Sequence, residues 1–108
     1  MSKMVKKLVL VTSDGHPQHK YFMRVASEVS KATGLEVETR KDDYTYLDKH
    51  GAKDDLGLTW LPQLLVQVGD DAFPILPEPV LTADGKLDYE AGVREALKRL
   101  EEVHGRDA

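Results

Sequence analysis

The sequence contains no cysteine, and this absence excludes several kinds of chemistry at once. Disulfide bonds, thiolate metal sites and thiol catalysis all need the cysteine sulfur. The chain also lacks any apolar stretch close to the roughly 20 residues that span a bilayer as a helix. The apolar run from Leu8 to Val11 follows three lysines, but it is too short for a secretory signal and no small-residue cleavage site follows it. We therefore expect a cytoplasmic protein without a membrane span.

Aromatic residues are few, and basic residues are fewer than acidic ones. The 108 residues include one Trp, two Phe and four Tyr, and 15 basic against 19 acidic side chains give a formal net charge of −4. Sequence-independent binding to nucleic acid needs clustered lysine and arginine, so we expect no nucleic-acid partner. The length suits one hydrophobic core, and residues 1–108 are expected to form a single domain.

Hydrophobic periodicity predicts seven elements of secondary structure. The apolar run 8–11 predicts a strand that is buried on both faces. Apolar residues spaced i, i+3, i+4 and i+7 from Phe22 to Val29 predict a helix that ends at Gly34. The predicted order is strand 8–11, helix 20–33, strand 35–39, helix 44–50, strands 63–68 and 72–76, and a helix from about 89 to 103 with Gly105 beyond its end. This βαβαββα order predicts an α/β fold with a mixed sheet of about four strands and helices on both faces.

Two of these strands are expected at the edges of the sheet. Strand 35–39 alternates apolar and polar residues, which is typical of a strand with one buried face. Pro74 has no N–H to donate to a neighbouring strand, so strand 72–76 is expected at the other edge. One interpretation of such edges is a structural unit that forms a homodimer; the alternative is a monomer.

At this length, the order of elements resembles the thioredoxin and glutaredoxin fold family, and two local features add to the resemblance. His16-Pro17-Gln18-His19 precedes the first helix, where the family carries its Cys-x-x-Cys motif. Trp60-Leu61-Pro62 precedes the third strand, where the family has a cis proline facing that motif. The resemblance implies a thioredoxin-like domain. Imidazole cannot form the mixed disulfide of thiol–disulfide exchange, so we expect a redox-inactive member and favour binding over catalysis.

The resemblance also implies a groove that docks partner chains. A cis bond between Leu61 and Pro62 would leave the Leu61 backbone exposed to pair with an extended peptide, whereas a trans proline would simply begin a strand. Trp60 is interpreted either as a partly exposed anchor beside this groove or as a core residue. The candidate residues for binding a protein or peptide partner are Asp14, His16, Pro17, His19, Trp60, Leu61 and Pro62.

His16 and His19 also suggest a metal site. Two histidines three residues apart at a helix start can lie on one face, and the positive end of the helix keeps imidazole neutral and able to bind a metal. Zinc or copper sites usually have three or four protein ligands. Asp14 could be a third ligand and His50 a fourth if the end of the second helix reaches this loop. A small zinc- or copper-binding protein or a metal-dependent enzyme is therefore an alternative function. The other interpretation is a pair of solvated surface histidines with no cofactor.

Three acidic pairs occur along the chain, at positions 42–43, 54–55 and 70–71. None has the spacing of a calcium-binding loop. Each precedes or interrupts an element of secondary structure, so we expect these carboxylates to cap helices and form turns.

Overall fold

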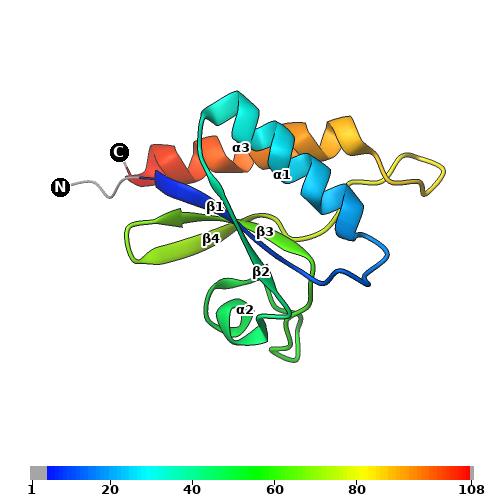
Figure 1. Cartoon of the computed structure of the whole chain (residues 1–108), viewed down its shortest axis with the longest axis horizontal. Helices are drawn as coiled ribbons and strands as arrows, with labels where there is room; N and C mark the ends of the chain where they lie inside the picture. The colour runs from blue at the N-terminus through cyan, green and yellow to red at the C-terminus, as the bar shows by residue number, and fades with distance from the viewer. Residues whose placement is uncertain (1–4, 108) are drawn as a thin grey trace.

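A four-stranded mixed sheet and three helices make up residues 5–107, the part of the chain that the computed structural model describes (Figure 1). The elements in chain order are β1 (Val5–Thr12), α1 (His19–Thr33), β2 (Val37–Lys41), α2 (Tyr44–His50), β3 (Gln63–Val68), β4 (Asp71–Leu76) and α3 (Tyr89–Asp107). Every predicted element is present. The predicted domain range also includes residues 1–4 and 108, which lie outside the described residues.

The predicted ends of some elements were wrong by a few residues. Helix α1 begins at His19, one residue before the predicted start, and Gln18 is its N-cap residue. Helix α3 continues through Gly105 to Asp107, although Gly105 was expected beyond its end. A glycine inside a helix costs only about 1 kcal/mol relative to alanine, so one glycine does not have to end it.

The strands lie in the order β2-β1-β3-β4. β1 pairs in parallel with β2, placing Leu8 opposite Val37, whereas β1 with β3 and β3 with β4 are antiparallel. The edge positions of β2 and β4 confirm the prediction, and proline is tolerated in an edge strand. Pro74 lies opposite Leu65 of β3, next to an irregularity in the β3–β4 register.

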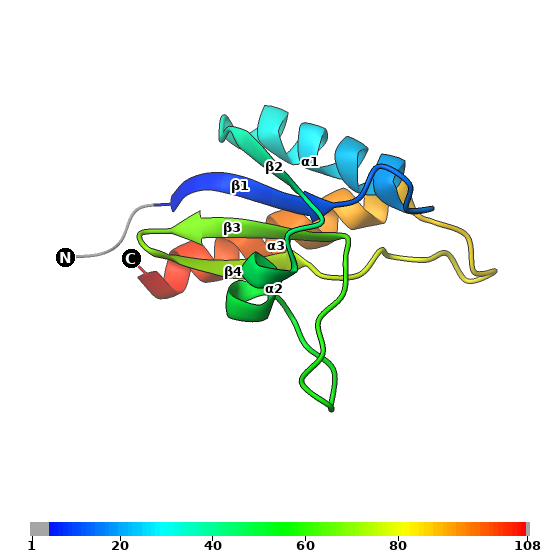
Figure 2. The ribbon, with the colours of Figure 1, turned by 60° about the horizontal axis from the view of Figure 1, so that its bottom comes forward.

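Apolar side chains on both faces of the sheet explain why helices cover both faces. Leu8 and Leu10 of β1 belong to a core formed with α1 and α3, whereas Val9 and Val11 belong to a smaller core formed with Leu47 of α2. Side chains alternate between the faces of a strand, so the continuous run in β1 supplies both cores. Figures 1 and 2 show α1 and α3 on one face of the sheet and α2 on the other. No helix within residues 5–107 is long and apolar enough to cross a membrane.

Asp43 holds the start of α2 through two contacts. Its Oδ1 accepts a hydrogen bond from the Tyr46 backbone N–H at 3.0 Å, and its Oδ2 pairs with Arg40 Nη1 at 2.9 Å. The backbone hydrogen bond and then the Arg40 guanidinium lower the pKa of the Asp43 carboxyl below its ordinary value of 3.8. The fold therefore stabilises the carboxylate form. This contribution is present above the ordinary pKa and is lost as pH falls through the lowered one.

We expect Asp43→Asn to reduce the loss of stability in acid. Asparagine keeps an oxygen that accepts the Tyr46 N–H but has no carboxylate to protonate. The measurement is the free energy of unfolding in urea between about pH 5 and about pH 2. Asp70→Asn, at an exposed carboxylate in the β3–β4 turn, is the matched control. An acid dependence as steep in Asp43→Asn as in the unaltered chain would contradict the role given to Asp43.

Candidate functional site

The sheet topology brings three connecting segments to one end of the molecule. Val11, near the end of β1, pairs with Gln63 at the start of β3, and Leu64 pairs with Leu76 at the end of β4. The segment before α1, the α2–β3 loop and the β4–α3 segment therefore all leave the sheet at this end. Figure 2 shows the α2–β3 loop and the β4–α3 segment extending beyond the sheet.

Gln63 fixes the base of the α2–β3 loop. Its side chain is fully buried, and its Oε1 accepts a hydrogen bond from the Ala52 backbone N–H at 2.9 Å. Its Nε2 has two hydrogens to donate and lies within hydrogen-bond distance of three acceptors: the backbone carbonyls of Ala52 at 3.2 Å and Trp60 at 2.9 Å, and Thr59 Oγ1 at 3.2 Å. One buried amide thus joins both ends of the loop, where the Ala52 N–H and the Trp60 carbonyl have no other partner among the described residues.

Tyr21 and Trp60 hold the β4–α3 segment. The Tyr21 hydroxyl donates to the Asp88 carbonyl at 2.9 Å and accepts from the Val80 N–H at 3.1 Å. Burial raises the pKa of Tyr21 above its ordinary value, which favours the neutral hydroxyl that makes both bonds. The Trp60 indole Nε1–H donates to the Pro77 carbonyl at 2.8 Å. The two aromatic side chains thereby fix this segment opposite the α2–β3 loop.

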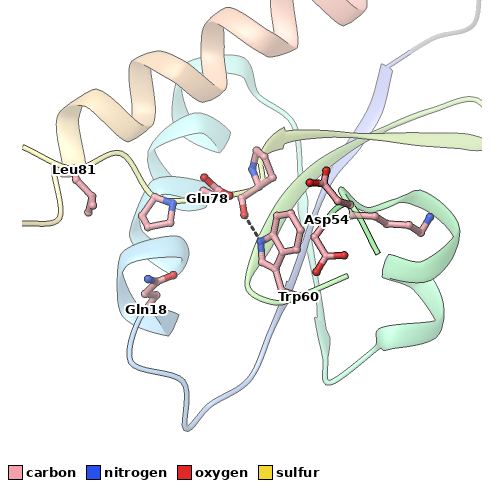
Figure 3. Close-up of a pocket in the computed structure, with 9 residues that line it drawn as sticks. Gln18, Asp54, Trp60, Glu78 and Leu81 are labelled. Carbon is pink, nitrogen blue, oxygen red and sulfur yellow. Dashed lines mark hydrogen bonds between the residues drawn. The ribbon is translucent and has the colours of Figure 1, made fainter. Parts of the chain in front are cut away.

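An open groove of about 730 Å³ lies between these segments. Gln18 contributes from the start of α1, Lys53 to Asp55 and Trp60 from the α2–β3 loop, and Pro77 to Pro79 together with Leu81 from the β4–α3 segment. Figure 3 shows Trp60 between Asp54 and Glu78, with its indole hydrogen-bonded to Pro77. The groove therefore combines an aromatic surface, apolar rings and several carboxylates.

Large apolar side chains are exposed on the two segments that border the groove. Leu56 is 84% exposed and Leu58 61% exposed on the α2–β3 loop, and Leu81 is 53% exposed on the β4–α3 segment. Of these three, Leu81 lines the groove, whereas Leu58 lines a separate pocket with Tyr44 and Asp48 of α2. Single exposed leucines are common, so the apolar contribution to the groove comes from Leu81 and the neighbouring prolines.

Trp60, Leu61 and Pro62 take different positions in the structure. Trp60 is half-buried and lines the groove, which fits the anchor interpretation better than the core interpretation. The Leu61 side chain packs into the core beside α2, and Pro62 is buried. The Leu61–Pro62 peptide bond is cis. Within residues 5–107, neither the N–H nor the C=O of the Leu61 backbone takes part in a hydrogen bond.

The other candidate binding residues lie in the segment before α1. His19 Nδ1 is 2.8 Å from the hydroxyl of the fully buried Thr12, and its Nε2 is 3.7 Å from Asp14 Oδ1. Asp14 also pairs with Lys41 at 3.0 Å, so His19 and Asp14 join the first helix to the ends of β1 and β2. His16 Nδ1 accepts a hydrogen bond from the Gln18 backbone N–H. None of Asp14, His16, Pro17 and His19 lines the groove, which Gln18 alone reaches from this segment.

The four side chains considered for a metal site do not form one cluster. Within residues 5–107, no group of three or more histidine and carboxylate side chains is placed to hold a metal ion. His50 packs instead against the Tyr46 ring, with the ring centroids 4.8 Å apart. Metal binding by His16 and His19 stays a prediction.

Several groove residues were missed by sequence reasoning. Asp54 was expected to act only in a turn, and its Oδ1 does accept the N–H groups of Leu56 and Leu58, but Asp54 also lines the groove. Gln18 lies inside the His16–His19 segment but was not among the candidate binding residues, and Glu78 and Leu81 belong to no motif. The one available signal was their position, because each lies in a connecting segment at the same end of the predicted sheet.

The sequence matches no protein-family model, and neither a curated protein nor a solved structure matches the chain. Its function must therefore be inferred from its own residues and their geometry.

Proposed function

We propose that this chain is a thioredoxin-like domain that binds peptide segments of partner proteins and carries out no thiol redox chemistry. The strand order β2-β1-β3-β4, with α1 and α3 on one face and α2 on the other, is compatible with that fold. The chain has no cysteine, so thiol–disulfide exchange has no nucleophile.

The groove at Trp60 is the observation that carries this proposal. Its volume lies in the range of sites that bind small ligands, and it is open to solvent. The indole is held by its bond to Pro77, so its ring offers a contact surface that loses little freedom when a partner binds. Tryptophan is the residue type most enriched among the dominant contacts of protein interfaces.

The backbone next to Trp60 in the chain supports a second means of recognition, although Leu61 itself does not line the groove. The Leu61 N–H and C=O have no partner among the described residues and directly follow Trp60 in the chain. An extended peptide recognises such free backbone groups by main-chain hydrogen bonds, while adjacent pockets select its side chains. No histidine, serine or threonine is among the described residues that line the groove, a composition that favours recognition over nucleophilic catalysis.

The proposal predicts that the protein enriches particular sequences from a displayed library of random peptides, and that Trp60→Ala weakens their binding. We expect a loss in affinity of about tenfold or more, because a central tryptophan typically contributes over 1 kcal/mol to an interface. Affinities would be measured by fluorescence anisotropy with the synthetic peptides. Thermal unfolding of each variant establishes that it is folded.

Two further variants serve as controls. Tyr44→Ala removes an aromatic side chain that is 52% exposed on α2 and does not line the groove, so it should leave the affinities unchanged. Trp60→Phe keeps an aromatic ring and should retain more affinity than Trp60→Ala. Enrichment of no sequence, or equal affinity for the unaltered chain and Trp60→Ala, would refute the proposal.

A further inference from the structure

The charges on the groove are predominantly negative. Asp54, Asp55 and Glu78 line it, and Lys53 is the one cationic residue among its described lining residues. Within residues 5–107 neither Asp55 nor Glu78 takes part in an ion pair or a side-chain hydrogen bond, whereas Asp54 is engaged in its own turn. Asp55 and Glu78 therefore keep their full capacity to pair with a cation.

The aromatic surface lies between these charges. Figure 3 shows Asp54 and Glu78 on either side of Trp60. The indole N–H is already bonded to the Pro77 carbonyl, so a ligand meets the ring rather than the N–H. The face of an indole attracts a cation more strongly than any other aromatic side chain does. An aromatic ring with Asp54 and Glu78 on either side is complementary to a side chain that is both long and positively charged.

The groove also has an apolar lining on one side. Pro77, Pro79 and Leu81 line it from the β4–α3 segment. A bare inorganic cation gains nothing from such surfaces, whereas a peptide with apolar residues beside its charged one covers them. Nucleic acid is repelled by the same carboxylates.

We infer that the groove takes an extended peptide segment in which a lysine or arginine lies between apolar residues, with the cation over Trp60 and paired with the free carboxylates of the lining, Asp55 and Glu78. This inference rests on the proposed function and names the class of its ligand. It also predicts that binding weakens with added salt, because exposed charge pairs are screened.

The test uses the same displayed library of random peptides. The enriched sequences should contain lysine or arginine beside leucine, isoleucine, valine or phenylalanine. The tightest of them would be synthesised with arginine, glutamine or glutamate at the cationic position. We expect the arginine peptide to bind about tenfold more tightly than the glutamine peptide, and the glutamate peptide to bind weakest.

Variants of the protein locate the source of this preference. In Asp55→Asn/Glu78→Gln the preference for arginine over glutamine should shrink to about threefold or less, because only the contact with the ring remains. Asp70→Asn/Glu102→Gln removes two exposed carboxylates outside the groove and should leave the preference intact. Thermal unfolding verifies that both double variants are folded.

Three outcomes are distinguishable. A preference unchanged in Asp55→Asn/Glu78→Gln, or enriched peptides without a cationic residue, would overturn the inference about charge while Trp60-dependent binding keeps the proposed function. Peptides that bind Trp60→Ala and the unaltered chain alike would overturn both. Self-association of the chain that enriched peptides do not displace would identify a second copy as the occupant and overturn the inference as well.

Discussion

Gly92→Ala is expected to lower the free energy of unfolding by about 2 kcal/mol, although alanine favours helices more than glycine does. A Cβ atom at position 92, in the first turns of α3, would lie 2.2 Å from the Tyr21 hydroxyl oxygen and 3.0 Å from Tyr21 Cζ. The Tyr21 ring cannot move aside freely, because it is buried in the core and its hydroxyl bonds to both Asp88 and Val80. Relief of the clash therefore breaks hydrogen bonds that hold the β4–α3 segment.

A double-mutant cycle separates this clash from other effects of the substitution. Tyr21→Phe removes the atom closest to the added Cβ, so Gly92→Ala should cost at least about 1 kcal/mol less in that background. Gly15→Ala is the control, because no atom lies within 4 Å of a Cβ built there. The measurement is urea unfolding of the four chains in the cycle and of Gly15→Ala. Equal costs of Gly92→Ala with and without the Tyr21 hydroxyl would contradict the role given to Tyr21.

Gln63→Leu is expected to destabilise the protein by about 3 kcal/mol and to weaken peptide binding. Leucine has a similar size but offers no donor or acceptor to Ala52, Thr59 or the Trp60 carbonyl. Backbone groups at both ends of the α2–β3 loop then lose their partners, and each such group costs about 1–3 kcal/mol when it stays buried. Because the α2–β3 loop positions Trp60, losing the hydrogen bonds of Gln63 also weakens the binding of peptides at the groove.

Gln67→Leu, on the same strand, is the matched control. Gln67 is half-buried, and its side chain makes one hydrogen bond, to the Gly69 carbonyl. We expect a cost below about 1 kcal/mol and an unchanged affinity for enriched peptides. Thermal and urea unfolding measure stability, and anisotropy measures affinity. A loss in Gln63→Leu no larger than that in Gln67→Leu would show that the buried amide does not anchor the loop.

The elements of the fold were predictable because their signals are local. The apolar run in β1, the helical spacing from Phe22 to Val29 and the missing N–H of Pro74 each act through neighbouring residues in the chain. From these signals the sequence predicts the number of strands, the edges of the sheet and the two helical layers.

The construction of the groove was not predictable in the same way. Tyr21 bonds to residues 59 and 67 positions away in the chain, and no periodicity marks such contacts. In the sequence, Gln63 has no feature that distinguishes it from other strand residues. Its complete burial in the structure means that its side-chain amide needs hydrogen-bond partners within the protein. The resemblance to the thioredoxin family predicted binding roles for Trp60, His16 and His19. Of these three, Trp60 lines the groove and the two histidines do not.

The most direct test of peptide binding at this groove is to follow backbone and indole N–H resonances of the protein while an enriched peptide is added. We predict that the largest shifts occur at Lys53 to Asp55, Glu78 and Leu81 and at the Trp60 indole N–H, which belongs to the single tryptophan of the chain. Shifts confined to another surface, such as the pocket of about 440 Å³ lined by Leu35, Leu97 and Leu100, would contradict peptide binding at the Trp60 groove.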